Sequence, residues 1–182
     1  MRLFVGIPLA EETRKELVAL EARLRRKAPK LRWSEPELWH ITLQFLGEAS
    51  AEQFDAVKAR LGEVQAAPVP IELEQLSCFE RAGVLHVGVR LTPQLVALQQ
   101  CVSAATAQCG FVPEERAYQP HITLARSRSS EDRRRVAELA KGVTHALRFT
   151  RFVAHEFVMY ESFPGPGGSR YEVRARFALG AE

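Results

Sequence analysis

Apolar positions recur along the chain with two different periods, and the change of period marks the elements we expect. Spacings of three and four residues, as among Leu17, Leu20 and Leu24, predict an amphipathic helix, whereas short apolar runs that end near proline predict buried strands. Ser50 and Gln53 form a capping-box sequence at the start of a second helix. In chain order, the first half predicts a strand over 3–7, a helix over 11–27, a loop over 28–38, a strand over 39–46, a helix to about residue 61 and a strand over 69–78.

The same order of elements returns after residue 84, which indicates an internal duplication. The second half predicts a strand over 84–90, a helix from Thr92-Pro93 to just before Gly110, a loop that leads into a strand at His121, a helix from Ser129 or Ser130 to Lys141 and a strand over 147–160. Equivalent positions are Val5 and Val87, Glu11 and Pro93, His40 and His121, and Ser50 and Ser130. The chain therefore predicts one repeat over about 1–80 and another over about 82–160.

Two copies are too few for a solenoid, so we expect a single bilobal domain over residues 1–182. The predicted fold class is α+β: pseudo-twofold duplicated lobes of antiparallel sheet, with outer helices, around a central cleft. A closing hairpin over 160–180, around the turn rich in glycine and proline at 164–168, breaks the symmetry.

Composition indicates an ordinary globular protein and limits its partner. Of 182 residues, 46% are hydrophobic and 26% are charged, so the chain can bury a sizeable core. The formal net charge of +3 permits an anionic substrate. It falls short of the dense basic surface of a protein that grips long nucleic acid by its phosphates, so we expect a small or terminal anionic group as the ligand.

Cysteine usage and hydropathy bear on the compartment. Cys78, Cys101 and Cys109 are an odd number with no Cys-x-x-Cys spacing, which argues against a disulfide framework and against a structural zinc site. The opening residues 1–7 are too short for the core of a signal peptide, and no apolar run reaches membrane-spanning length. We expect a reducing, cytoplasmic location and no membrane partner.

The tetrapeptide His-Ile-Thr-Leu occurs twice, beginning at His40 and at His121, within two predicted strands. Side chains alternate between faces along a strand, so His40 shares a face with Thr42, and His121 shares one with Thr123. A single His-x-Thr in a strand is more often an ordinary solvent-facing pair than a site. The composition predicts only about 0.2 such pairs by chance, so two identical copies indicate function.

Two histidines and two hydroxyls that face one cleft suit general acid-base attack on a phosphate ester. Imidazole titrates near pH 6.5, so one histidine can accept a proton from water while the other donates one to the leaving oxygen. Thr42 and Thr123 would donate hydrogen bonds to the non-bridging oxygens. Metal binding is the main alternative, but no carboxylate or third histidine lies at ligand spacing near either motif, and threonine is a poor ligand. We expect no metal and no other cofactor.

Phe45 and Arg126 each lie five residues after a motif histidine. If the lobes are related by a twofold axis, the two side chains occupy equivalent places at the cleft, one as a stacking face and the other as a phosphate-binding fork. A regular strand would turn this position away from the histidine face, so both roles require a twist, a bulge or a strand end. A core position for Phe45 and a solvated one for Arg126 are the alternatives.

Other candidate residues carry weaker signals. His86 shares a strand face with Gly88 and Arg90, so we expect it on a polar face at the rim of the site. The remaining candidates are His145 and His155, expected on the surface, and Trp33, Trp39 and Tyr118, which could stack a base but more commonly pack in a core.

The paired motifs resemble the two-histidine phosphoesterase superfamily, and within it the bacterial and archaeal RNA 2′,3′-cyclic phosphodiesterases once named 2′-5′ RNA ligases. The likeness covers nearly the whole chain. Residues 2–7 look like the opening strand of the family, 38–47 like its first motif and 120–126 like its second. Residues 160–173 are similar to its closing hairpin.

The resemblance implies a bilobal α+β fold and metal-independent opening of a cyclic phosphate on an RNA end. The site residues that it implies are His40 and His121 as catalytic groups, Thr42, Thr123 and Arg126 as phosphate contacts, and Phe45 as a base-stacking surface.

The leading hypothesis is hydrolysis of RNA 2′,3′-cyclic phosphate ends to 2′-phosphate by a monomer whose partners are RNA ends or nucleotides with this group. A related enzyme that acts on another cyclic nucleotide, or that joins RNA ends by a 2′,5′ link, is an alternative. A non-catalytic module that binds RNA ends is another. A pure binder needs cations and stacking more than two titratable bases, so the two intact motifs favour an enzyme.

Overall fold

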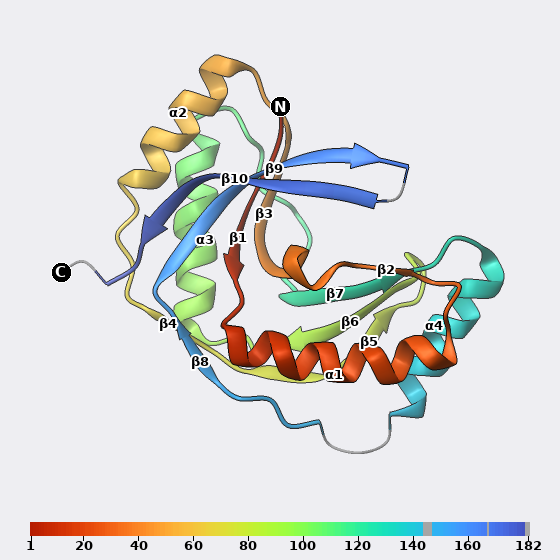
Figure 1. Ribbon diagram of the computed structural model, residues 1–182. Helices are drawn as coiled ribbons and strands as arrows, with labels where there is room; N and C mark the ends of the chain where they lie inside the picture. The colour runs from red at the N-terminus through yellow and green to blue at the C-terminus, as the bar shows by residue number, and fades with distance from the viewer. Residues whose placement is uncertain (144–146, 167, 181–182) are drawn as a thin grey trace.

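Two four-stranded antiparallel sheets carry most of the regular structure in this computed structural model (Figure 1). The structure describes residues 1–143, 147–166 and 168–180. One sheet has the strand order β10-β9-β1-β3 and the other has the order β2-β7-β6-β5, and strands β3 and β7 are in contact. The predicted α+β fold class is confirmed.

Each sheet buries one face against helices. The first sheet contains β1 (Arg2–Pro8), β3 (His40–Glu48), β9 (Glu156–Gly165) and β10 (Gly168–Ala178). The second contains β2 (Arg32–Trp33), β5 (Leu73–Phe79), β6 (Val84–Val89) and β7 (His121–Arg126). A small third sheet pairs β4 (Val69–Ile71) with β8 (Phe152–Ala154). Val5, Ile41 and Ile122 are fully buried on the inner faces, so alternation fixes which side chains of β1, β3 and β7 face away from the core.

Four helices of the described chain flank the sheets (Figure 1). They are α1 (Glu11–Lys27), α2 (Ala51–Gly62), α3 (Pro93–Ala107) and α4 (Ser130–Gly142), with a short 3₁₀ helix η1 (Pro36–Leu38). α3 contacts β3 and α2, whereas α4 contacts β5 and β6. Arg135 of α4 donates a 2.7 Å hydrogen bond to the carbonyl of Lys27, so α1 ends beside α4. Within the described residues, no helix has the length and apolar character needed to cross a membrane.

The predicted helix starts are confirmed by their caps. Ser50 accepts a hydrogen bond from the backbone of Gln53, whose side chain accepts one from the backbone of Ser50, as a capping box requires. Thr92 caps α3 through the backbone of Leu95, and Ser129 caps α4. These local bonds satisfy backbone N–H groups that have no partner within the helix.

Two predicted long strands are each divided in two. Residues 69–78 split at Glu72 into β4 and β5, and the stretch 147–160 becomes β8 and β9, separated at His155. In both cases the first part joins the small sheet and the second part joins a four-stranded sheet. The alternation of buried positions continues across Glu72, from Ile71 to Leu73, whereas at His155 it shifts by one residue, from Ala154 to Phe157.

The predicted loop 28–38 contains one short strand and one turn of 3₁₀ helix. Trp33 donates a 3.0 Å hydrogen bond from its indole Nε1 to the carbonyl of Ala28, and the Ser34 backbone N–H donates one to the carbonyl of Leu124. These contacts add β2 to the edge of the second sheet beside β7. The loop prediction is wrong at residues 32–33 because two residues are too few to show a period.

The equivalent strands pair in the same way, but each four-stranded sheet takes two strands from the other part of the chain: β9 and β10 in the first sheet, β2 and β5 in the second. β1 pairs with β3 and β9, and β6 pairs with β7 and β5, so β5 and β9 occupy corresponding places. Val5 pairs with Gln44 and Leu85 pairs with Ala125, which makes Leu85 the counterpart of Val5 and corrects the predicted match with Val87 by two residues. The duplication over 1–80 and 82–160 stays a prediction, and the two sheets are not its two halves.

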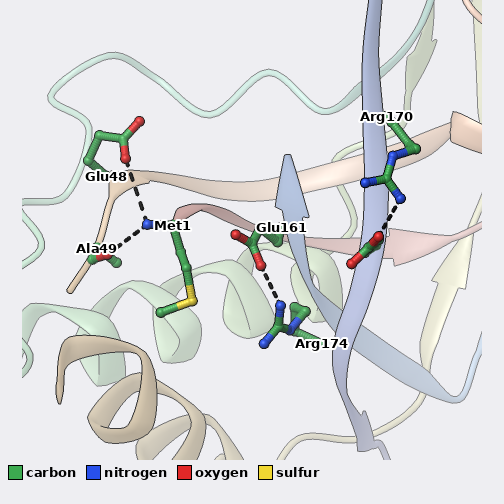
Figure 2. Close-up of polar contacts among 7 residues, drawn as sticks. Met1, Glu48, Ala49, Glu161, Arg170 and Arg174 are labelled. Atoms are coloured by element: carbon green, nitrogen blue, oxygen red, sulfur yellow. Dashed lines mark hydrogen bonds and ion pairs between the residues drawn. The ribbon is translucent and has the colours of Figure 1, made fainter. Parts of the chain in front are cut away.

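Polar contacts hold the N-terminus and the closing hairpin in place (Figure 2). The ammonium group of Met1 donates a 2.9 Å hydrogen bond to the carbonyl of Ala49 and lies 3.8 Å from the carboxylate of Glu48, so the start of β1 is tied to the end of β3. Arg174 pairs with the buried carboxylate of Glu161 across β10 and β9. These bonds hold the strands of the first sheet whose aromatic side chains contact His40.

Candidate active site

β3 has one extra residue directly after its His-x-Thr segment. Gly6 of β1 pairs with Thr42, and the preceding Val5 pairs with Gln44, which leaves Leu43 without a partner. Leu43 and Gln44 are both buried, so two successive side chains point toward the core. A β-bulge of this kind shifts the alternation by one residue.

β7 has the same bulge at the same place. His86 pairs with Thr123 and Leu85 pairs with Ala125, which leaves Leu124 as the extra residue. From the histidine onward, the two strands share one burial order: half-buried, buried, half-buried, buried, buried, exposed.

The bulges return Phe45 and Arg126 to the face that carries the histidines. The Phe45 side chain is 59% exposed, and Arg126 is also exposed. Gln44 is turned inward in exchange: it is 5% exposed and accepts a 2.8 Å hydrogen bond from the hydroxyl of Thr106. The bulge that the two predicted positions require is therefore present in both strands, and the core position considered for Phe45 is wrong.

The His40 ring is oriented by its own strand. Nδ1 lies 2.7 Å from the carbonyl oxygen of Leu38, and Nε2 lies 3.1 Å from the hydroxyl of Thr42. A carbonyl oxygen can only accept, so Nδ1 carries the hydrogen and Nε2 of the neutral ring accepts from Thr42. The nitrogen available for proton exchange is therefore Nε2.

Three aromatic rings enclose His40 on the side of the first sheet. Phe4 lies with its ring centroid 4.7 Å from the imidazole, and Tyr171 contacts it edge-on at 5.4 Å. Tyr160 lies 5.8 Å away and stacks on Phe4. Phe45 lies 6.0 Å from Phe4 at the open edge of this cluster.

Burial lowers the pKa of His40 to about 4. The hydrogen bond to the Leu38 carbonyl opposes this shift, and the positive charges of His121 and Arg126 add to it. His40 is neutral at pH 7 in the unliganded protein.

His121 repeats the backbone arrangement of His40. Its Nδ1 lies 2.7 Å from the carbonyl oxygen of Gln119, two residues earlier, so Nε2 is again the nitrogen on the far side of the ring. Phe79 contacts the ring edge-on at 4.8 Å. Burial lowers the pKa of His121, the Gln119 hydrogen bond opposes the shift, and Arg126 adds to it.

His86 lies beneath His121 and not at a polar rim. It is 6% exposed, stacks on Phe79 with centroids 4.2 Å apart and meets the His121 ring at 5.1 Å. Burial, and then the charge of His121, lower the pKa of His86 to about 4, and the nearby Val84 backbone opposes this shift to a smaller extent. Nδ1 of His86 is buried and has no hydrogen-bond partner among the described residues. The rim prediction is wrong because an imidazole beside a phenyl ring packs as an aromatic side chain.

Arg126 acts on both histidines. Its charge lowers the pKa values of His40 and His121, and that of Tyr171 as well. Groups from both sheets therefore lie within electrostatic range of one guanidinium, and an anion bound beside Arg126 would also adjoin both imidazoles.

A cavity of about 1120 Å³ extends from His121 over β6 and β5. Phe79, His86 and Gly88 line it near the histidine, and Arg90 lines its far side. His40 and Arg126 are not among its lining residues, so the cavity covers one side of the site and leaves room beyond the reacting group.

A family model described as the 2′-5′ RNA ligase superfamily matches residues 8–162. The chain belongs to this superfamily. An RNA 2′,3′-cyclic phosphodiesterase of Bacillus subtilis is 31% identical over 137 residues, which are 71% of this chain and 73% of that protein. One of Methanocaldococcus jannaschii is 27% identical over 176 residues, 95% of this chain and 98% of that protein. The solved structure of Escherichia coli LigT complexed with 3′-AMP is 27% identical, with a TM-score of 0.80 over 98% of this chain and 96% of that chain.

In this member of the 2′-5′ RNA ligase superfamily, all six predicted site residues lie on two contacting strands, one from each four-stranded sheet. His40, Thr42 and Phe45 come from β3, and their counterparts His121, Thr123 and Arg126 come from β7: this is the complete predicted set. The sequence analysis missed the aromatic neighbours of the histidines, namely Phe4, Phe79, Tyr160 and Tyr171, and it placed His86 at the rim instead of against His121. Only strand pairing reveals them, although Phe4 does share a strand face with Gly6, which lies opposite Thr42.

The donor groups of the site suit proton transfer better than metal binding. Among the described residues, no group of three or more His, Cys, Asp and Glu side chains lies close enough together to hold an ion. Because Nδ1 of each histidine donates to a carbonyl oxygen, each ring offers only Nε2, and the other groups of the two motifs are hydroxyls, which are poor metal ligands. Metal independence of this superfamily member stays a prediction that its donor set supports.

Of the remaining candidates, the two tryptophans and His155 lie away from the site, and Tyr118 supports its backbone. Trp33 and Trp39 are buried in the core, and Tyr118 donates a 2.9 Å hydrogen bond to the backbone carbonyl of Thr42. Packing, the commoner role of such aromatics, accounts for the two tryptophans. His155 is exposed, as predicted, whereas His145 lies outside the described residues.

Proposed function

We propose that this chain hydrolyses the 2′,3′-cyclic phosphate at an RNA end and leaves a 2′-phosphate. The observation that carries the proposal is the pair of imidazoles on contacting strands, each with Nδ1 bonded to a carbonyl and Nε2 on the opposite side of the ring. The name RNA 2′,3′-cyclic phosphodiesterase, borne by the B. subtilis and M. jannaschii relatives, supports it. So does the complex of E. coli LigT with 3′-AMP.

In the proposed mechanism, His121 accepts a proton from water while the water oxygen bonds to phosphorus. The bond from phosphorus to O3′ breaks, and His40 donates a proton to O3′, which becomes a hydroxyl. Phosphate stays on O2′. The balance is one water consumed for one phosphodiester bond broken, with the proton taken up by His121 replacing the proton lost by His40.

The hydrogen bond between Thr42 and His40 suggests how the site prepares for this reaction. In the neutral site the Thr42 hydroxyl donates to Nε2. A bound phosphate anion favours protonation of His40, whose Nε2–H then becomes a donor, and this frees the Thr42 hydroxyl to donate to a non-bridging oxygen. Thr123 serves the second oxygen, and the planar fork of Arg126 stabilises the negative charge that develops at phosphorus.

We propose that Phe45 stacks on the terminal base. Its exposed ring lies at the edge of the aromatic cluster around His40, and an exposed phenyl face accepts every base. The chain would act as a monomer in a reducing cytoplasm, where its free thiols at Cys78, Cys101 and Cys109 suit the conditions.

The deciding experiment is incubation of the protein with adenosine 2′,3′-cyclic phosphate, followed by ³¹P NMR of the product. The proposal predicts adenosine 2′-phosphate alone. Formation of the 3′-isomer, or no turnover of any cyclic phosphate end, would contradict it. Addition of an RNA with a free 5′-hydroxyl to the same assay separates hydrolysis from 2′,5′ joining. A substrate with a 3′-thio leaving group assigns the roles: it should rescue His40→Ala far better than His121→Ala.

A further inference from the structure

We infer that Arg32, together with Arg126 and Arg2, forms a second phosphate subsite, which takes the phosphate on O5′ of the nucleoside whose cyclic phosphate lies at the histidines. The identity of the group at the histidines rests on the proposed function. The subsite itself rests on the pairing of β2 with β7.

Arg32 lies directly opposite Arg126 in the antiparallel pair of β2 and β7. Their neighbours Trp33 and Ala125 are buried on the other face, so both arginines stand on the exposed face that carries the histidines. Directly opposed side chains have Cβ atoms about 4.5–5.5 Å apart, and like charges at this distance destabilise a sheet. Arginine cannot relieve the repulsion by losing its proton. A bound anion would offset the repulsion between the two guanidinium groups.

Within the described chain, no carboxylate forms an ion pair with Arg2, Arg32 or Arg126. Arginines elsewhere do have such partners: Arg25 near β2 pairs with Glu21, and Arg174 on the other sheet pairs with Glu161. The cations at the site are thus left available for an anion that comes from outside the chain.

Three arginines, on strands of both sheets, act electrostatically on the Tyr171 hydroxyl. Arg126, Arg32 and Arg2 all oppose the rise that burial causes in the pKa of the Tyr171 hydroxyl. Arg2 stands two residues before Phe4, on the same face of β1, and Phe4 contacts Tyr171 at 4.9 Å. All three guanidinium groups therefore lie within electrostatic range of Tyr171, whose ring contacts His40.

The chemistry of the substrate class identifies the anion. A nucleoside 2′,3′-cyclic phosphate has one further position for a phosphate ester, the 5′-oxygen. That phosphate belongs either to the preceding link of an RNA chain or to a 5′-monophosphate. Arginine forks bind both, since both present two non-bridging oxygens.

Binding tests the subsite without turnover. Titration calorimetry compares adenosine 2′-monophosphate with adenosine 2′,5′-bisphosphate on the wild type, Arg32→Gln, Arg32→Lys and the control Arg26→Gln, an exposed arginine of α1. The wild type and the control should bind the bisphosphate at least roughly 10-fold more tightly than the monophosphate, and this affinity ratio is the one expected for one charge-assisted contact. Arg32→Gln should lose most of this ratio, and Arg32→Lys should keep part of it. An equal ratio in the wild type and Arg32→Gln, or no preference in the wild type, overturns the inference.

Kinetics separate the two sources of phosphate. The kcat/KM of the wild type is measured on the 2′,3′-cyclic phosphates of adenosine, 5′-phosphoadenosine and the dinucleotide ApA. Preference for the dinucleotide alone assigns the subsite to the RNA chain, and preference for the 5′-phosphorylated nucleoside alone assigns it to a free nucleotide. Equal preference for both assigns it to any O5′ phosphate, and preference for neither overturns the inference. Absence of turnover on all three substrates would refute the proposed function, and the binding ratio would still decide the subsite.

Discussion

The Thr106 hydroxyl donates a 2.8 Å hydrogen bond to the side-chain oxygen of Gln44, at a buried position where β3 meets α3. Gln44 follows the bulged Leu43 and precedes Phe45. This bond satisfies the oxygen of the amide that the bulge turns into the core, whereas the amide nitrogen has no partner among the described residues. The satisfied oxygen supports the bulge and thereby the exposed position of Phe45.

Replacement of Thr106 by valine should lower the free energy of unfolding by about 1–3 kcal/mol, because the buried oxygen of Gln44 loses its donor. The double variant Gln44→Met, Thr106→Val should be less destabilised than Thr106→Val, since neither side then needs a hydrogen bond. Urea unfolding of the two single variants and the double variant measures this. Equal stability of Thr106→Val and wild type would show that the bond does not support the bulge.

Removal of the Phe45 ring should weaken substrate binding and leave stability unchanged. Phe45→Ala should raise the KM for a cyclic nucleotide roughly 10-fold, as expected when one base loses its stacking partner. The free energy of unfolding should change by less than about 0.5 kcal/mol, because the side chain is mostly exposed. Steady-state kinetics provide the test, with Val112→Ala as an exposed apolar control. An unchanged KM would exclude Phe45 from the base site.

Substitution of Arg126 should act on the chemical step. Arg126→Gln should lower kcat/KM by about 10²- to 10³-fold, the usual effect of losing one donor to developing negative charge. Lysine should restore part of the loss, because it keeps the charge without the planar fork. Arg128→Gln, two residues further along the chain, is the matched control. Full activity in Arg126→Gln would mean that this guanidinium does not contact the phosphate.

The buried His86 predicts a loss of stability in acid. Its folded pKa of about 4 lies below the ordinary value near 6.5, so the unfolded chain binds a proton first as the pH falls. The free energy of unfolding should therefore decrease between about pH 6.5 and pH 4, by up to about 3 kcal/mol from this residue.

His86→Phe should show a smaller decrease over the same range, and the exposed His155→Asn should behave as the wild type does. Urea unfolding at several pH values makes the comparison. Parallel pH curves for wild type and His86→Phe would show that His86 is not buried in its neutral form.

The sequence was sufficient for the helices and for the two histidine strands. Ser50, Thr92 and Ser129 act within a few residues of themselves, so local spacing predicts their caps correctly. The His-Ile-Thr-Leu repeat likewise encodes its own alternation, which puts each histidine beside its threonine.

The bulges and the strand exchange depend on distant partners. In a regular strand, the sequence predicts an outward-facing Gln44 followed by an inward-facing Phe45. The bulge formed by pairing with β1 exchanges the two orientations. The breaks at Glu72 and His155 separate strands that join different sheets, and at Glu72 the alternation of buried positions is continuous. The polar side chain of His86 predicted an exposed position, but His86 is buried because it stacks on Phe79 of the neighbouring strand. Such contacts between distant residues have no local period.

The most direct test of the account is the rate of hydrolysis of adenosine 2′,3′-cyclic phosphate by protein exhaustively treated with a chelator, measured for wild type, His40→Ala and His121→Ala. The two-histidine mechanism predicts full activity of the wild type without metal. Each variant should lose roughly 10²- to 10⁴-fold in the chemical rate while it stays folded, as expected for removal of a general acid or base. Wild-type turnover in either variant, or wild-type activity that disappears with the chelator and returns with a divalent ion, would contradict the two-histidine mechanism.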